Sequence, residues 1–164
     1  MQTAPDAPRQ ASIHIEKGSI GFAAAHFNCL GGGRELLHGH NYTAGLRAYG
    51  DVQADGAIVD FSVLKEALRA VCAELDHRML VPTRSSDVAV EELPDGHVAM
   101  RYTDGARFLF PRGDCVLLPV PNSTCECLAA HVLERVRGLL GEVPVRLEVA
   151  IEEAPGQGAV VAEP

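Results

Sequence analysis

The sequence between Ile20 and Gly50 alternates apolar side chains with other residues on both sides of a glycine-rich loop. Because successive side chains of a strand point to opposite faces, every second residue of such a segment shares a face. The shared face of IGFAAAHF contains Ile20, Phe22, Ala24 and His26, and that of HGHNYTAGLRAYG contains His38, His40, Tyr42, Ala44, Leu46 and Ala48. This pattern predicts an antiparallel hairpin with the long loop NCLGGGRE.

Two later segments change to apolar steps of three and four, which predicts amphipathic helices. The first, DFSVLKEALRAVCAELDH, begins where Asp60 or Ser62 can cap a helix, and the second, NSTCECLAAHVLERVRGLL, begins with Ser123 and Glu126 at the spacing of a capping box. The expected buried stripes are Phe61, Leu64, Leu68, Val71 and Leu75, and then Leu128, Val132, Val136 and Leu139. Alternation returns in VRLEVAIEE, and GAVVAE is expected to form a last short strand.

Three short strand candidates lie between the two helices, separated by the turn sequences PDG and TDG. We expect residues 84–113 to form a small antiparallel β insertion and not a separate domain. Residues 1–10 carry two prolines and no apolar pattern, and are expected to be a disordered arm. Residues 11–164 then form a single α+β domain, long enough to bury a core without disulfides.

Composition excludes several classes of function. The net charge of −8 argues against general nucleic-acid binding, which requires a basic face. No apolar run approaches the roughly 18 residues of a membrane-spanning helix. The N-terminus lacks the pattern of a signal peptide, so a cytoplasmic protein is expected. The five cysteines are odd in number and form no CxxC pair, which supports neither a disulfide framework nor a cysteine zinc ribbon.

Three histidines fall on the inward faces at one end of the predicted hairpin. His38 and His40 are two positions apart, so their rings project side by side, and the antiparallel partner can bring His26 to them. Three imidazoles with a fourth position left for water or substrate form the pattern of a catalytic zinc site, although other divalent metals also bind imidazole. Alternatively, these residues could be ordinary surface histidines or hydrogen-bonded histidines of the core.

Three further polar residues, Glu153, Asp76 and His77, lie at positions that suggest either a structural or a functional role. Glu153 continues the inward series of its strand, and a buried carboxylate is unfavourable unless it meets a cation or anchors a polar ligand. Asp76 and His77 end the first helix, where His77 could simply interact with the helix dipole. The residues alone leave these alternatives open.

The ordered segments FAAAHF, LHGHNY, GAIVDFSVLK, LDHRML, NSTCECLA and IEEAPG resemble the 6-pyruvoyl-tetrahydropterin synthase superfamily, which includes the 6-carboxytetrahydropterin synthases. The resemblance covers the chain apart from the N-terminal arm and the insertion. It implies a tunnelling fold, with a four-stranded antiparallel sheet and two helices on one face. It also implies a homo-oligomer, either a trimeric barrel or a dimer of trimers, with active sites between subunits.

The resemblance assigns a role to each candidate residue. A zinc ion would be held by His26, His38 and His40, and the pterin ring would be anchored by Glu153 through a paired contact with its amino group and ring N–H. Further pterin contacts are implied for Ser123 and Thr124, although a capping role would also explain them. The family's proton-transfer pair corresponds to Asp76 and His77, and we expect irregular backbone where these adjacent residues face each other.

One departure from the family pattern concerns the catalytic cysteine, which usually lies four or six positions before the first histidine of HGH. Those positions hold Arg34 and Gly32 here, and Cys29 lies further upstream. Glu35 instead matches a subgroup with an ExxHGH motif, in which glutamate replaces cysteine as the acid/base group. The alternative is that Glu35 is a solvated loop charge. Arg34 could meet a substrate triphosphate or face solvent.

The resemblance implies a zinc-dependent carbon–carbon lyase that acts on the side chain of 7,8-dihydroneopterin triphosphate. Its product would be 6-hydroxymethyl-7,8-dihydropterin or 6-carboxytetrahydropterin. The alternatives are 6-pyruvoyl-tetrahydropterin synthesis by triphosphate elimination, and a catalytically silent homologue that binds pterin or metal. The sequence does not choose the natural substrate among related pterins.

Overall fold

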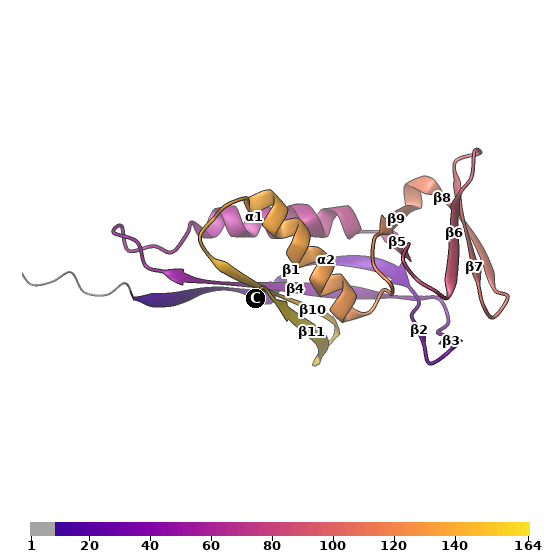
Figure 1. The fold of residues 1–164 in the computed structure, drawn as a ribbon, viewed down its shortest axis with the longest axis horizontal. Helices are drawn as coiled ribbons and strands as arrows, with labels where there is room; N and C mark the ends of the chain where they lie inside the picture. The colour runs from indigo at the N-terminus through magenta and orange to yellow at the C-terminus, as the bar shows by residue number, and fades with distance from the viewer. Residues whose placement is uncertain (1–8) are drawn as a thin grey trace, which may run out of the picture.

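The computed structural model describes residues 9–164, and its first strand, β1, spans Gln10–His26. The disordered arm expected over residues 1–10 therefore falls almost wholly outside the described residues. Figure 1 shows two helices lying together over one face of a long sheet, with a smaller sheet at one end. The helices are α1 (Phe61–Leu75) and α2 (Cys125–Leu140), and the fold belongs to the α+β class.

The large sheet has the strand order β11-β10-β4-β1-β5-β9. Its remaining strands are β4 (His38–Asp51), β5 (Arg78–Pro82), β9 (Cys115–Leu118), β10 (Arg146–Ala154) and β11 (Gln157–Ala162). Four neighbours, β11, β10, β4 and β1, pair antiparallel as expected. The expectation of only four strands is wrong, because β5 pairs parallel with the end of β1 and β9 pairs parallel with β5.

A main core fills the space between this sheet and the two helices. Its largest fully buried side chains are Tyr42, Leu46, Leu64, Leu68, Leu75, Leu80, Leu118, Leu128, Leu147 and Ile151. The predicted helical stripes supply most of the helical contribution, but Phe61 is 49 % exposed and Leu139 is 53 % exposed. Phe61 is the first residue of α1, and at the end of α2 it is Leu140, not Leu139, that packs against the core.

The helix starts agree with one capping prediction and correct the other. Asp60 caps α1, since its side chain accepts a hydrogen bond from the Ser62 N–H at 2.8 Å. The predicted Ser123–Glu126 capping box is wrong, because Thr124 is the N-cap of α2 and accepts from the Cys127 N–H. Ser123 lies one residue earlier and is fully buried, which leaves it available for another role.

A second, three-stranded sheet lies between α1 and α2 in the chain. Its strands are β6 (Val88–Glu92), β7 (His97–Tyr102) and β8 (Arg107–Pro111), all antiparallel, and a short 3-10 helix, η1 (Arg112–Asp114), follows. It covers a second core consisting of Phe27, Met79, Val81, Val88, Val98, Met100, Tyr102 and Cys115. Phe27 directly follows β1, so the second core begins where the main sheet ends.

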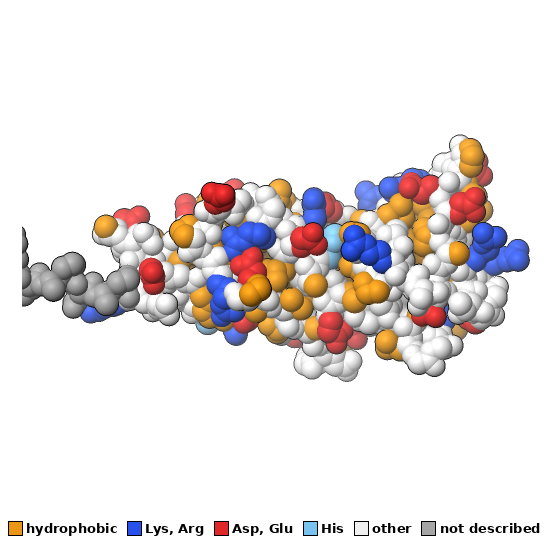
Figure 2. All heavy atoms as spheres, in the orientation of Figure 1, with side chains coloured by type: hydrophobic (Ala, Val, Ile, Leu, Met, Phe, Trp, Pro, Cys, Tyr) orange, Lys and Arg blue, Asp and Glu red, His pale blue; other side chains and the backbone are white. Residues whose placement is uncertain are grey.

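The loop between β1 and β4 forms a small ribbon of its own, with β2 (Cys29–Leu30) paired to β3 (Gly33–Arg34). Gly31 and Gly32 have φ values of 60° and 79°, a conformation that other residues rarely adopt. Figure 1 places this ribbon beside the three-stranded sheet. Figure 2 shows acidic and basic side chains interspersed on the face in view. None of the helices in residues 9–164 is both long and apolar enough to cross a membrane.

Candidate metal centre and its surroundings

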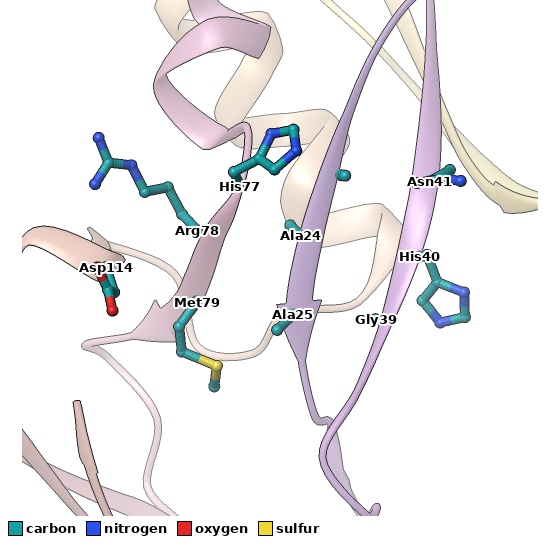
Figure 3. Close-up of a pocket in the computed structure, with 10 residues that line it drawn as sticks. Ala24, Ala25, Gly39, His40, Asn41, His77, Arg78, Met79 and Asp114 are labelled. Carbon is teal, nitrogen blue, oxygen red and sulfur yellow. The ribbon is translucent and has the colours of Figure 1, made fainter. Parts of the chain in front are cut away.

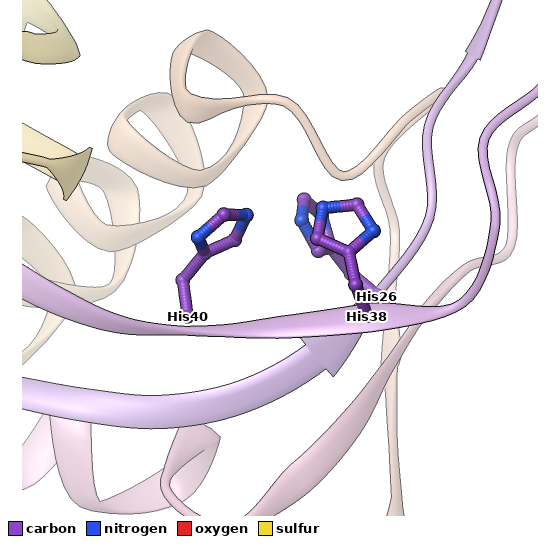
Figure 4. Close-up of side chains that lie close together, drawn as sticks. All are labelled: His26, His38 and His40. Carbon is purple, nitrogen blue, oxygen red and sulfur yellow. The ribbon is translucent and has the colours of Figure 1, made fainter.

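Three imidazoles converge where β1 ends and β4 begins. The antiparallel register places His26 opposite His38 and Ala24 opposite His40. One ring nitrogen from each histidine lies within 4.8 Å of the others, and Figure 4 shows the three rings on the same side of the strands. The sequence prediction that these three side chains meet is confirmed, and the cluster could hold a metal ion.

Gly39 allows this arrangement because the strands approach closely between the two histidines of β4. A Cβ atom at position 39 would lie 2.9 Å from the backbone oxygen of Ala24, closer than real Cβ atoms approach such a neighbour without displacing it. The glycine of HGH is therefore required by the packing of β4 against β1, whatever the histidines bind.

Backbone carbonyls orient two of the rings. The Nδ1 atom of His38 lies 2.7 Å from the Leu36 carbonyl, and that of His26 lies 3.2 Å from the Ser123 carbonyl. A histidine that donates from Nδ1 presents the lone pair of Nε2, as metal-binding histidines usually do. The Nε2 atom of His26 is buried and has no hydrogen-bond partner, so it is an orphaned polar atom that a metal ion would satisfy.

The electrostatics of His26 favour the neutral, metal-binding form. Burial lowers the pKa of its imidazole, and the neighbouring His38 lowers it further, while the contact with the Ser123 carbonyl opposes the shift. A neutral imidazole is the form that binds a divalent metal. The donor set, its geometry and its protonation state therefore all fit a metal ion.

Ser123 supports His26 from behind. The hydroxyl oxygen lies 3.3 Å from the His26 Nδ1 atom and 3.2 Å from both the Phe27 carbonyl and the Asn28 side-chain oxygen. These contacts hold Ser123 between His26 and the two residues that follow it. The sequence gave Ser123 the role of a helix cap. It gave no sign of the contact with His26, because the two residues lie 97 positions apart in the chain.

Glu35 lies in the loop that precedes the histidines of β4, and it is exposed. Its carboxylate accepts a hydrogen bond from the Asn28 N–H at 3.2 Å, and its own N–H donates to the Asn28 carbonyl at 3.0 Å. This pair of contacts closes the β2–β3 ribbon at its base, two residues after His26. The carboxylate is therefore tethered near the end of β1.

Cys29 is in the same ribbon but is held differently. The Asn122 side chain accepts from the Cys29 N–H at 3.3 Å and donates to its carbonyl at 2.9 Å. Burial raises the pKa of the Cys29 thiol, and the nearby Asp87 carboxylate raises it further. The thiol is thus kept in its neutral, less nucleophilic form.

Glu153 follows the buried Ile151 on β10 and is half-buried. The Cys125 thiol at the start of α2 lies within hydrogen-bonding reach, with its sulfur 3.5 Å from the Glu153 Oε2 atom. Burial and then the adjacent Glu153 charge raise the pKa of Cys125 to about 12, so this thiol remains a neutral donor. This contact involves only one of the two carboxylate oxygens of Glu153.

Tyr42 connects these groups and was missed as a site residue. It is 2 % exposed, its ring packs against those of His26 and His40, and its hydroxyl has no hydrogen-bond partner. Burial raises the pKa of this hydroxyl most, and Cys125, Glu153 and Glu35 raise it further. The sequence signal for Tyr42 was its place on the same strand face as His38 and His40, two positions after His40.

Asp76 and His77 form the expected pair, with 2.8 Å between the His77 Nδ1 atom and the Asp76 carboxylate. The predicted irregular backbone is confirmed, because His77 has a φ of 56°. The Ala23 N–H donates to Asp76 at 2.7 Å and, with His77, lowers the pKa of the carboxyl group. The structure does not bring the pair into the histidine cluster. Figure 3 shows His77 at a hollow beside β1, from which the His40 ring points away.

Comparison with known proteins places these features in context. The family model described as 6-pyruvoyl tetrahydropterin synthase matches residues 15–164. A protein of Methanocaldococcus jannaschii, provisionally named 6-carboxy-5,6,7,8-tetrahydropterin synthase, is 33% identical over 129 residues, covering 76% of this chain and 78% of its own. A 31% identical protein of Pyrococcus horikoshii carries the same provisional name and covers 76% of this chain and 73% of its own.

Solved structures give the same result. The 6-pyruvoyl tetrahydropterin synthase of Plasmodium vivax superposes with a TM-score of 0.89 at 34% identity, covering 94% of this chain and 98% of its own. A second structure of that enzyme is of a catalytic-residue mutant in which a glutamate is replaced by alanine. It superposes with a TM-score of 0.89 at 33% identity, and again covers 94% of this chain and 98% of its own.

Proposed function

This chain belongs to the 6-pyruvoyl tetrahydropterin synthase family, and we propose that it is a zinc-dependent lyase that cleaves the side chain of 7,8-dihydroneopterin triphosphate. The observation that carries the proposal is the tethering of Glu35 near the three-histidine cluster, in a chain that lacks a cysteine at the family's usual positions. The Plasmodium vivax catalytic-residue mutant supports a glutamate in a catalytic role in a structurally similar enzyme.

In this proposal His26, His38 and His40 hold the zinc ion, since their geometry and the orphaned Nε2 atom of His26 fit one. A zinc ion supplies Lewis acidity, which lowers the pKa of a ligated hydroxyl group. Ser123 is assigned to orienting His26 and not to the pterin, because its hydroxyl is fully buried among protein groups. Thr124 retains its cap of α2, next to the pterin site.

Glu153 anchors the pterin ring. Its half-buried carboxylate would accept hydrogen bonds from the ring's amino group and adjacent N–H, and charge-assisted pairs of this kind are directional. The neutral Cys125 thiol fixes one oxygen of the carboxylate and so helps to set its orientation. The ring then lies with its side chain toward the histidine cluster.

Glu35 takes the proton of the second side-chain hydroxyl, counted from the ring. The bond between the first and second side-chain carbons breaks, its electron pair passes into the ring imine, and a proton is returned to the first carbon. The products are 6-hydroxymethyl-7,8-dihydropterin and a triphosphorylated two-carbon aldehyde. 6-Carboxytetrahydropterin cannot form by this step alone, because its carboxyl carbon is more oxidised than a hydroxymethyl carbon; its formation would need a rearrangement before the bond breaks, in which electrons of the first side-chain carbon pass to the ring and to the departing fragment. The exposure of Glu35 in one subunit leaves it accessible to substrate.

The second proton-transfer group is His77, oriented by Asp76. Because the pair lies apart from the cluster within one chain, we propose that His77 acts in the site of a neighbouring subunit. A trimer or a dimer of trimers would bring the two parts together.

The mass of the pterin product tests this function. The zinc-loaded protein is incubated with 7,8-dihydroneopterin triphosphate, and the expected product is 6-hydroxymethyl-7,8-dihydropterin or its 6-carboxy counterpart. Exclusive formation of 6-pyruvoyl-tetrahydropterin with release of triphosphate would contradict the cleavage proposal. Metal binding without turnover of any dihydropterin would instead identify a silent homologue.

A further inference from the structure

Arg34, the residue before Glu35, is not the solvent-exposed side chain that the sequence left open, because it contacts other parts of the chain. Its side chain is only 15% exposed, and its Nε atom donates to the Asp104 carboxylate at 3.1 Å. Asp104 lies 70 positions later, in the turn between β7 and β8 of the three-stranded sheet. An ion pair therefore joins the loop between β1 and β4, which carries Glu35, to the β insertion.

Three aromatic rings form a platform for the same guanidinium group. The Arg34 Cζ atom lies 5.5 Å from the ring centre of Phe27, 5.7 Å from that of Tyr102 and 5.3 Å from that of Phe108. These rings also contact one another, with Phe27 4.5 Å from Tyr102 and 5.1 Å from Phe108 between centroids. Phe27 and Tyr102 belong to the second core, so the platform is part of the insertion's packing.

The same guanidinium group holds the backbone of Glu35. Its Nη1 atom donates to the Glu35 carbonyl at 2.8 Å, while the Glu35 carboxylate and N–H are bonded to the Asn28 backbone. Arginine can make these contacts at once because its planar group carries donors in several fixed directions. A displacement of about 1 Å in a catalytic group can lower a rate by as much as about 100-fold.

We infer that Arg34 and Asp104 are positioning residues, and that the β insertion acts through them to hold Glu35 for proton transfer. The inference rests on the proposed catalytic role of Glu35. It assigns the insertion a function in the reaction, although its three strands contribute no residue to the histidine cluster. Arg34 acts through the backbone of its neighbour and does not touch the substrate.

The Asp104→Asn variant tests the inference with little disturbance of the turn. The Asp104 carboxylate accepts a hydrogen bond from the Ala106 N–H at 2.9 Å, and asparagine keeps an oxygen for this bond. It removes the negative charge that pairs with Arg34. We expect kcat to fall about tenfold, with KM and zinc content unchanged. Glu91→Gln is the matched control, because the Glu91–Arg101 pair lies in the same sheet, is 61% exposed on both sides and is 3.7 Å long. The control should leave kcat unchanged.

A double-mutant cycle identifies the route of the effect. If Arg34 and Asp104 act through Glu35, Asp104→Asn should lower kcat in the parent but not in the Glu35→Gln background. Equal losses in both backgrounds would overturn the inference. A loss for Glu35→Gln with none for Asp104→Asn would overturn the positioning role of Arg34 and Asp104 alone. Full activity of Glu35→Gln would overturn that positioning role together with the proposed catalytic role of Glu35.

Two further measurements test the order of the loop and separate positioning from triphosphate binding. Hydrogen exchange in the peptide covering residues 28–37 should become faster in Asp104→Asn and not in Glu91→Gln, and unchanged exchange would contradict the inference. Arg34→Lys should lower kcat because one ammonium cannot serve Asp104 and the Glu35 carbonyl in the same geometry. A rise in KM that disappears with unphosphorylated 7,8-dihydroneopterin would instead assign Arg34 to the triphosphate and overturn the inference.

Discussion

The main core and the second core support different halves of the candidate site. The main core lies between two helices and the long sheet, and fixes the strands that carry His26, His38 and His40. The second core lies under the insertion, and through Phe27 and Tyr102 it fixes the loop that carries Glu35. Metal binding and proton transfer should therefore respond to separate sets of substitutions.

The largest effect is expected from His38→Ala, which removes a metal ligand. His38 is exposed, so its loss should not disturb either core. We expect the zinc content to fall and kcat/KM to drop by more than about 100-fold, because altering even an outer-shell partner of a metal site typically weakens affinity or activity by about 10–100-fold. Metal analysis and thermal unfolding of the metal-free proteins check this. Retention of stoichiometric zinc would contradict the assignment of the ligand set.

Leu68→Ala tests the main core alone. Leu68 is completely buried in α1, so its truncation should lower the free energy of unfolding by about 2–5 kcal/mol. Denaturant unfolding measures the loss. At a temperature where the variant is folded, the two-core account predicts that kcat per zinc-loaded molecule stays near that of the parent. A loss of kcat without loss of folded protein would contradict the separation.

Phe108→Ala tests the platform beneath Arg34. Phe108 is half-buried, so we expect a loss of about 1–3 kcal/mol in unfolding free energy, together with a lower kcat at unchanged zinc content. Phe61→Ala is a matched control, because Phe61 is 49% exposed on α1. Equal kcat values for the two variants would show that the platform does not influence the reaction.

The smallest effect is expected at the far end of the main sheet, at Glu163. Arg137 donates two hydrogen bonds to its carboxylate, both 2.6 Å, and the Leu147 N–H donates a third at 2.8 Å. These contacts, led by Arg137, lower the pKa of Glu163 below its ordinary value of 4.5. The stabilisation is therefore present above pH 4.5 and is lost as pH falls through the lower folded-state value.

Glu163→Gln should lower the free energy of unfolding by about 1–2 kcal/mol at neutral pH, after allowance for partial exposure. The difference from the parent should shrink below pH 4.5, and kcat should not change. Unfolding curves at several pH values check this. A difference that is independent of pH would contradict the assigned ionisation.

Sequence patterns predicted the parts of the molecule whose neighbours are close in the chain or repeat regularly. Alternation gave the β1–β4 pairing and the histidine cluster, and the PDG and TDG turns gave the three strands of the insertion. The parallel strands β5 and β9 were missed because their apolar runs, RMLVP and CVLL, show no alternation.

Other features depended on contacts that no local pattern contains. The Arg34–Asp104 pair joins positions 70 residues apart, and the Ser123–His26 contact joins positions 97 apart. The capping-box spacing to Glu126 favoured Ser123 over Thr124, but both residue types cap helices well, and only the path of the chain distinguishes them. The resemblance favoured Glu35 over Cys29 as the acid/base group, but no local pattern showed that Glu35 bonds to Asn28 and Cys29 to Asn122.

The most direct test of the account compares Glu35→Gln with Cys29→Ser under identical conditions, with kcat and zinc content measured for both. We predict that Glu35→Gln retains zinc and loses at least about 100-fold in kcat, as expected for removal of an acid/base group. Cys29→Ser should keep both, since its thiol is held neutral and its backbone is tied to Asn122. Loss of activity in Cys29→Ser, with an active Glu35→Gln, would contradict the account.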